Sequence, residues 1–190
     1  MDLIVVPADH DLRSATEDFI AEIYDKHYNA RVSTFPPVLL AMRNADGELQ
    51  CASGLRFAQN GFFSDVYLDV PVERTLSRAT GRHISRGDVF EVTNLASRAP
   101  HAATRFLHHI IAYGDLVGFE WAFFTATARV RTLLQRVGLP MLTLAPAERS
   151  RVANPAIWGS YYAASPHVCA VDRAAAAIYL SQKVESAVHV

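Results

Sequence analysis

The chain has 190 residues, of which 51% are hydrophobic and 19% are charged, a composition that predicts one compact globular domain and excludes a disordered or fibrous chain. Its 18 basic and 19 acidic residues give a net charge of -1, so no overall positive charge attracts nucleic acid or an anionic membrane. Two cysteines, Cys51 and Cys169, are too few for a disulfide scaffold, which favours a reducing cytoplasm. The apolar residues 3–6 are too short for a signal peptide, and no run is long enough for a transmembrane segment.

The first half of the chain predicts a strand, a helix and a hairpin. Residues 3–6 are expected to form a short strand, and a helix is expected from Ser14 to about Tyr28, with Ser14 and Glu17 as a capping box. Strands at 38–43 and 49–58 flank the turn residues Ala45-Asp46-Gly47. A short helix is expected around Pro71, and the polar residues 78–88 predict a loop.

The second half predicts strands that alternate with helices. A strand at 89–96 precedes a helix opened by Pro100 and His101, and a strand at 121–127 precedes a helix at 128–137 that Gly138 ends. Further strands are expected at 141–144 and 168–171, and an alanine-rich helix from about Arg173 to Val184 closes the chain. The pattern predicts a single α/β domain over residues 1–190, whose last helix suits packing or dimerisation, so a homodimer is one expected partner.

The loop from Ser97 to Ala103 is the first candidate for ligand binding, because ligands of open α/β sheets bind beyond the carboxyl ends of the strands. Its small residues allow a ligand to approach the backbone. The free N–H groups of the following helix suit a phosphate or pyrophosphate, to which Arg98 and Arg105 would add charge. The alternative is an ordinary helix start. The loop has no glycine, so it is neither a Walker loop nor a dinucleotide fingerprint.

Glu91 is the best single candidate for chemistry, because a carboxylate inside an apolar strand is costly unless it is paired or has a task. It could deprotonate an amine or hold a cationic substrate. The alternative is a buried ion pair with Arg56, another charged residue in an apolar strand. By alternation Glu91 and Thr93 share one face of the strand and Asn94 points to the other, so the three act together only if the strand kinks or bulges.

The segment Trp158-Gly159-Ser160-Tyr161-Tyr162 combines apolar rings with hydroxyl and N–H groups, which suits the wall of a pocket. Tyr161 or Tyr162 could donate a proton to a leaving thiolate, although buried tyrosines that merely satisfy their own hydroxyl are commoner. Ser160 lacks the Gly-x-Ser-x-Gly context of an activated nucleophile. The eight histidines include no His-x-x-x-His pair, so no metal site is predicted.

Five segments in order resemble the thermostable hemolysin family, over roughly residues 41–171. They are Phe63 to Pro71, Val89 to Ala96, Phe124 to Thr127, Val130 to Leu139 and Trp158 to Tyr162. The family name records a hemolytic phenotype rather than a reaction. The resemblance therefore indicates a family without giving a mechanism.

The order of elements is also similar to the superfamily of Gcn5-related N-acetyltransferases and acyl-homoserine lactone synthases. Leu55-Arg56 resembles the arginine strand of the synthases, and Glu91 resembles their glutamate. Asn94 stands where the synthases have an arginine, and the loop from Arg98 to Ala103 lacks the glycines of the acetyltransferases. The resemblance implies a mixed, mostly antiparallel sheet with a parallel, splayed central pair, flanked by helices.

This resemblance implies an acyltransferase that moves an acyl group from a pantetheine thioester, either acyl-CoA or an acyl carrier protein, to a small amine or amino-acid-derived acceptor. No permanently bound cofactor is expected. The alternatives are a protein that perturbs membranes directly and a noncatalytic thioester-binding module.

The candidate catalytic residues are Glu91, Tyr161 and Tyr162. The candidate donor-binding residues are Leu95, Ala96, Arg98, His101, Ala102, Ala103 and Arg105. The candidate acceptor-binding residues are Arg56, Thr93, Asn94, Trp158 and Ser160.

Overall fold

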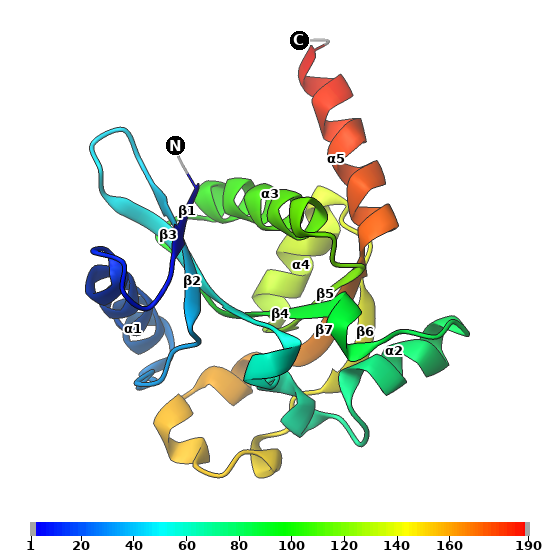
Figure 1. Ribbon diagram of the computed structural model, residues 1–190. Helices are drawn as coiled ribbons and strands as arrows, with labels where there is room; N and C mark the ends of the chain where they lie inside the picture. Colours follow the sequence, from blue (N-terminus) through cyan, green and yellow to red (C-terminus); the bar gives the residue numbers. More distant parts are fainter. Residues whose placement is uncertain (1–2, 189–190) are drawn as a thin grey trace.

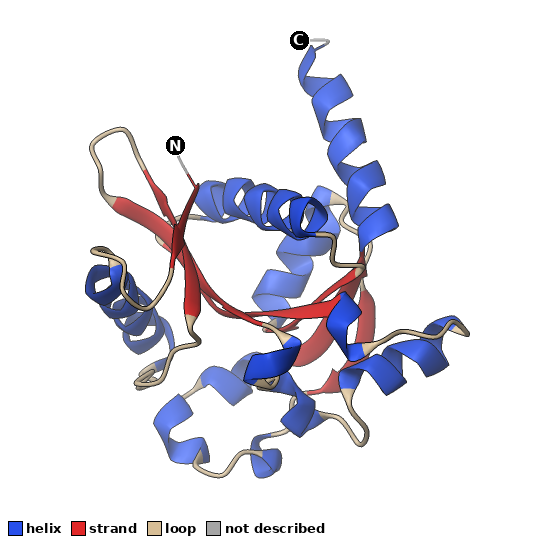
Figure 2. Cartoon of the chain, viewed as in Figure 1, coloured by secondary structure: helices blue, strands red, loops and turns tan. Residues whose placement is uncertain are grey.

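The computed structural model describes residues 3–188, which form a seven-stranded mixed sheet covered by helices on both faces (Figures 1 and 2). The strands are β1 (Leu3–Val6), β2 (Val38–Arg43), β3 (Leu49–Arg56), β4 (Val89–Ser97), β5 (Trp121–Ala126), β6 (Leu142–Pro146) and β7 (His167–Asp172). The helices are α1 (Arg13–Tyr28), α2 (Val72–Thr80), α3 (Pro100–Val117), α4 (Ala128–Val137) and α5 (Arg173–Val188).

The strands lie in the order β1-β2-β3-β4-β5-β7-β6. Only β4 and β5 run parallel, and the other neighbouring pairs of the described sheet are antiparallel. A parallel pair needs a crossover connection, which α3 supplies here. The predicted fold class, a mostly antiparallel sheet with a central parallel pair, is confirmed.

The parallel strands β4 and β5 pair over only part of their length. Their partners run from Val89 with Trp121 to Val92 with Phe124, after which β4 continues to Ser97 without a partner on β5. The outer edges of both strands remain paired, β4 with β3 and β5 with β7. The sheet is therefore intact on either side of an opening between its two central strands, which confirms the predicted splay.

A β-bulge lies where this opening begins. Gly54 on β3 pairs with Thr93 and Ala52 pairs with Ala96, so Ser53 faces two residues of β4. One of the two, Asn94, has a φ of 51°, a left-handed conformation that asparagine tolerates better than most residues. Glu91, Thr93 and Asn94 could act together only if this strand kinked or bulged, and the structure has such a bulge.

The helices α3 and α4 cover one face of the sheet, while α1, α2 and the short helical turns cover the other (Figure 1). Phe106 and Ile110 of α3 are buried against the sheet residues Leu55 and Phe90. A Cβ atom on Gly114 would lie 2.8 Å from the Phe90 ring, so this glycine lets α3 lie close to β4. The start of α5 is tied to the end of α3 by the ion pair between Arg173 and Asp115, at 2.6 Å.

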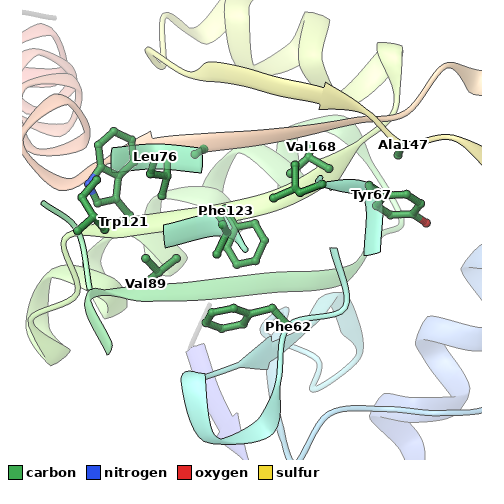
Figure 3. Close-up of a cluster of buried hydrophobic side chains, with 12 residues drawn as sticks. Phe62, Tyr67, Leu76, Val89, Trp121, Phe123, Ala147 and Val168 are labelled. Atoms are coloured by element: carbon green, nitrogen blue, oxygen red, sulfur yellow. The ribbon is translucent and has the colours of Figure 1, made fainter. Parts of the chain in front are cut away.

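The face covered by α2 holds a cluster of buried side chains (Figure 3). Phe62 packs edge-on against Phe123 with ring centroids 5.0 Å apart, and Leu76 anchors α2 on this cluster. The helix continues through Thr80 and ends at Gly81, whose φ is 70°. The loop predicted from residue 78 is thus wrong in its first three residues, because the buried Val72 and Leu76 hold the helix in place.

The predicted capping box of the first helix is wrong as well. α1 begins at Arg13, one residue before Ser14, and its start has no side-chain cap. Glu17 instead pairs with Arg13 at 2.6 Å, and the same guanidinium donates to the carbonyl oxygens of Pro36 and Pro37. A long-range contact with the segment before β2 has replaced local capping.

Candidate functional site

Two cavities lie on opposite faces of the sheet and meet at the opening between β4 and β5. The larger, the apolar cavity, has a volume of about 350 Å³ and lies under α3 and α4. The smaller, the polar cavity, has a volume of about 80 Å³ and lies on the α1 face. The residues common to both linings define what we call the junction: Tyr24, Val92, Asn94, Thr125 and Tyr161. The two cavities therefore adjoin at the splayed strands, where these five residues form a shared wall.

The surface of the apolar cavity is mostly apolar, although polar side chains such as Asn94, Asp115 and Arg173 also line it. Its walls come from β4, β5, α3, α4 and α5, and include Leu95, Leu107, Ile111, Val130 and Leu134. Part of the space follows directly from the splay, because the two strands no longer fill the layer beneath α3 and α4. A concave apolar surface of this kind suits a hydrocarbon chain, with few polar groups to fix its position.

The polar cavity has the opposite character. Among the described residues that line it are two arginines, Arg31 and Arg56, and the hydroxyl residues Ser33, Thr34, Ser64, Thr93 and Thr125, but no aspartate or glutamate. Aromatic rings, including those of Phe63 and Trp158, form the remaining wall, with their centroids 5.7 Å apart. The Arg56 Nε and Thr93 Oγ1 atoms are buried without a hydrogen-bond partner in the described structure. The cavity thus presents donors that the chain itself leaves unused.

Glu91 is fully buried beside these cavities, and it lines neither of them in the described structure. Its carboxylate accepts hydrogen bonds from the backbone N–H groups of Phe63, at 2.6 Å, and Ser64, at 2.8 Å. Burial raises the pKa of Glu91, while these hydrogen bonds and the charge of Arg56 act against that rise. Arg56 is its cross-strand neighbour. The expected buried ion pair is therefore corrected: the partners within hydrogen-bond distance of the carboxylate are backbone groups.

Two hydroxyl groups connect Glu91 with the junction. The Ser64 hydroxyl lies 2.8 Å from the Thr125 hydroxyl, and it also lowers the pKa of Glu91 through a side-chain hydrogen bond. Thr125 lines both cavities. A continuous path of hydroxyl groups thus runs from the opening in the sheet to a buried carboxylate.

Of the two candidate tyrosines, only Tyr161 reaches the junction. Its ring packs edge-on against Tyr28, 5.3 Å between centroids, and its hydroxyl donates to the Thr125 carbonyl at 3.4 Å. Burial raises the pKa of Tyr161 well above its ordinary value, so the hydroxyl keeps its proton at neutral pH. Tyr162 is not among the residues that line the two cavities, and its hydroxyl lies 2.7 Å from that of Tyr67.

The structure separates the candidate donor-binding residues. Leu95 lines the apolar cavity, whereas the residues of α3 that do so begin at Leu107, beyond the helix start where phosphate binding was expected. Arg98 faces α1, because its guanidinium lies over the Phe19 ring and donates to the Leu49 carbonyl. The contacts of Arg98 are thus with α1 and the start of β3, and its role in binding a thioester stays a prediction.

The other candidate donor-binding residues lie outside both cavities in the described structure. The small side chains of Ala96 and Ala102 are buried in the core, where they fill space between the sheet and its covering helices. His101 and Arg105 are exposed on the first turns of α3, with Ala103 between them. Their role in binding a thioester stays a prediction.

The candidate residues of the aromatic segment 158–162 also differ in whether they line a cavity. Trp158 lines the polar cavity. Ser160 instead ties the segment to the end of α1, because both its N–H, at 2.8 Å, and its hydroxyl, at 3.2 Å, donate to the Tyr28 carbonyl. Between them Gly159 has a φ of 50°, and a Cβ atom there would lie 2.1 Å from the same carbonyl oxygen. Ser160 is therefore placed as a structural contact rather than in the cavity wall.

Three junction residues, Tyr24, Val92 and Thr125, were absent from the sequence-based candidates. Tyr24 has the spacing of a core residue of the first helix, and nothing local distinguishes it from its apolar neighbours. Thr125 is a polar residue inside an apolar strand, the same signal that singled out Glu91. Applying that criterion to every strand would have found Thr125.

Within residues 3–188 no three His, Cys, Asp or Glu side chains come together as a metal site would require. None of the described helices combines the length and the apolarity needed to cross a bilayer.

The fold is that of acyl-homoserine lactone synthases and Gcn5-related N-acetyltransferases. The chain is similar to TofI in an apo form, with 12% identity over 93% of this chain and 96% of that one and a TM-score of 0.64. It is similar to FeeM, an N-acyl amino acid synthase from uncultured soil microbes, with 13% identity over 90% and 92% of the chains and a TM-score of 0.60. BjaI, a CoA-dependent acyl-homoserine lactone synthase with SAM and isopentyl-CoA, gives 10% identity, coverage of 95% and 87%, and a TM-score of 0.59.

The sequence profile of the thermostable hemolysin family matches residues 6–177, and the chain belongs to that family. No curated protein sequence matches it. The family resemblance inferred from five segments is confirmed, over a longer part of the chain than those segments covered.

Proposed function

We propose that this protein transfers an acyl group from a pantetheine thioester to a small amine at the junction. The observation that carries the proposal is that an apolar and a polar cavity adjoin at the splayed pair β4 and β5 and share five lining residues there. An acyl transfer needs both environments at one point, because the donor brings a hydrocarbon chain and the acceptor brings a polar amine. FeeM, an N-acyl amino acid synthase, and BjaI, a CoA-dependent acyl-homoserine lactone synthase, share the fold, and this agrees with the proposal.

The donor would lie with its acyl chain in the apolar cavity and its thioester carbonyl at the junction. The unpaired edges of β4 and β5 offer backbone groups to the amides of a pantetheine arm, as a neighbouring strand would. Acyl-CoA and an acyl carrier protein both present this arm, so the proposal covers both.

The acceptor amine would enter from the polar cavity and attack the thioester carbon. Its nitrogen forms the new C–N bond, and its proton passes to the Thr125 hydroxyl, then through the Ser64 hydroxyl to the Glu91 carboxylate. When the C–S bond breaks, the thiolate takes a proton from the Tyr161 hydroxyl. Glu91 then releases its proton to solvent and the Tyr161 phenolate takes one up, so both groups return to their starting states. Glu91 is thus the base that completes the path, although it does not touch the amine.

The test is a set of acyl-CoA thioesters of increasing chain length, each mixed with a panel of amines and amino acids. Release of free thiol and the mass of the acylated product are measured together. Ile111→Trp fills the apolar cavity and should shift the preference to shorter chains. Leu116→Trp on the same helix is the control, because Leu116 is 85% exposed. Absence of acylated product with every thioester, acyl carrier protein included, would overturn the proposal.

A further inference from the structure

We infer that the acceptor carries a carboxylate and that Arg56 binds it in the polar cavity, so that the acceptor is an amino acid rather than a simple amine. This inference rests on the proposed function, which leaves the two kinds of acceptor open. It assigns a separate subsite, on the α1 face of the sheet, to the negative end of the acceptor.

The Arg56 side chain has hydrogen-bond donors that the chain itself does not use. Arg56 stands at the end of β3 and lines the polar cavity, and its side chain makes no hydrogen bond or ion pair in the described structure. Its Nε–H is buried as well as unpartnered. A guanidinium has five N–H donors in a planar fork, a geometry that matches the two oxygens of a carboxylate. Buried donors of this kind are normally satisfied, so an absent partner is the simplest explanation.

The acidic residue opposite Arg56 in the sheet does not supply that partner. Glu91 is the cross-strand neighbour of Arg56, but its carboxylate accepts from the backbone N–H groups of Phe63 and Ser64. The effect of Arg56 on Glu91 is through its charge, which lowers the pKa of Glu91. The positive charge of Arg56 therefore remains available to a ligand.

The surroundings favour an anion that also accepts hydrogen bonds. Arg31 adds a second positive charge to a lining that includes no described acidic residue. Thr93, one residue before Asn94, contributes a buried hydroxyl that has no partner either. A carboxylate oxygen would accept from this hydroxyl while the guanidinium holds the other side of the group.

The position of this subsite also fixes the direction of the acceptor. A carboxylate held by Arg56 leaves the rest of the molecule to extend towards the junction residues Asn94 and Thr125, which both cavities share. In an α-amino acid the amine and the carboxylate are attached to the same carbon. The small polar cavity, of about 80 Å³, suits so compact an arrangement.

The experiment compares each amino acid with the amine that its decarboxylation gives: tyrosine with tyramine, phenylalanine with phenethylamine, and alanine with ethylamine. Acyl transfer is measured as kcat/KM for the full chain and for Arg56→Gln, Arg56→Lys and Arg74→Gln. Arg74→Gln is the matched control, because Arg74 is exposed on α2 and lines neither cavity. Circular dichroism checks that each variant is folded.

With the unaltered chain, we expect the best amino acid to exceed its amine by about 10- to 10²-fold in kcat/KM, the range that a charge-assisted contact supplies. Arg56→Gln should bring that ratio close to unity, Arg56→Lys should restore part of it, and Arg74→Gln should keep it. Equal rates with amine and amino acid, or a preference that survives in Arg56→Gln, would overturn the inference while acyl transfer itself stands.

A second readout decides the inference when no thioester gives a product. Binding of the same amino acids and amines, without any donor, is followed by calorimetry and by saturation-transfer nuclear magnetic resonance. Binding of an amino acid that is lost in Arg56→Gln and absent for its amine supports the subsite even if the proposed function fails. No amino-acid binding, or equal binding of inorganic phosphate as a general anion, would overturn it.

Discussion

The Ser64 hydroxyl lies 2.8 Å from the Thr125 hydroxyl, and this contact joins the buried Glu91 to the place where the two cavities meet. Because Glu91 is fully buried and lines neither cavity in the described structure, a substrate amine at the junction would not touch its carboxylate. Any proton that Glu91 accepts from the junction would have to pass through the two hydroxyls. The proposed base, Glu91, therefore depends on the uncharged hydroxyl groups of Ser64 and Thr125 to receive a proton from the junction.

Thr125→Val tests this dependence, because valine keeps the branched shape and removes the hydroxyl. We expect Thr125→Val and Glu91→Gln each to lower kcat by about 10²- to 10⁴-fold, the usual contribution of a general base, with little change in acyl-chain preference. The double variant should be little worse than the single ones, since all three break one path. Thr143→Val, outside both cavities, is the control. A Thr125→Val protein with unchanged kcat would exclude the hydroxyl path.

Glu91 should also shape the pH dependence of stability. Burial raises its pKa in the folded chain above the ordinary value of 4.5, so between those two values the folded chain binds more protons than the unfolded chain. The free energy of unfolding contributed by this group therefore falls as the pH rises through that interval. Glu91→Gln does not titrate and should lose this part of the pH dependence.

The measurement is urea unfolding of both proteins at intervals upward from about pH 4, close to the ordinary pKa of a glutamate. The difference in unfolding free energy between the unaltered chain and Glu91→Gln should shrink as the pH rises. A constant difference would mean that Glu91 has the same pKa in both states. An unfolded Glu91→Gln protein would instead show that the backbone N–H groups of Phe63 and Ser64 require a carboxylate.

The order of strands and helices could be read from the sequence because local signals and tertiary contacts agree along most of it. Gly138 ends α4 in a left-handed conformation, as its position predicts, and the apolar periodicity of α3 matches its buried face. Where the prediction failed, a distant contact decided the outcome. Arg13 begins α1 by binding the backbone of Pro36 and Pro37, more than twenty residues away, and no local pattern reports such a contact.

The candidate site was predictable only in part, for a related reason. A polar residue in an apolar strand is visible in the sequence, and this signal found Glu91, Arg56 and Thr93. The direction in which each side chain points is set by the bulge at Asn94 and by the splay of β5, which depend on pairing between distant segments. The sequence therefore singled out β4, which borders both cavities, but it did not indicate that the α3 residues lining the apolar cavity begin at Leu107 rather than at the first turns.

Gly159 should be indispensable for the aromatic wall of the polar cavity. Alanine there combines an unfavourable left-handed conformation with a Cβ atom 2.1 Å from the Tyr28 carbonyl oxygen. Gly47→Ala is the matched control, because Gly47 has a φ of 83° but open space around its Cβ position. We expect Gly47→Ala to cost about 1–2 kcal/mol of stability, the strain of a left-handed residue alone.

Gly159→Ala should cost more and also displace Trp158 from the cavity. Denaturant unfolding gives the first quantity. Quenching of tryptophan fluorescence by acrylamide gives the second, because the other tryptophan, Trp121, is buried in the core. Equal stability losses and equal quenching in the two variants would show that the segment moves away from Tyr28 without consequence.

The hemolytic phenotype recorded in the family name has a chemical explanation under the proposed function. Joining an acyl chain to a polar amine yields an amphiphile, and each buried methylene adds about 0.8 kcal/mol to its partition into a membrane. A long-chain product would therefore disorder a bilayer at modest concentration while the protein itself does not touch it.

We expect purified protein, without thioester or amine, to cause no leakage from erythrocytes or dye-loaded vesicles. Solvent extracts of cells that produce the unaltered protein should lyse erythrocytes, and extracts from cells with Glu91→Gln should not. Prompt leakage in proportion to the concentration of purified protein would favour direct membrane attack and exclude the product as the lytic agent.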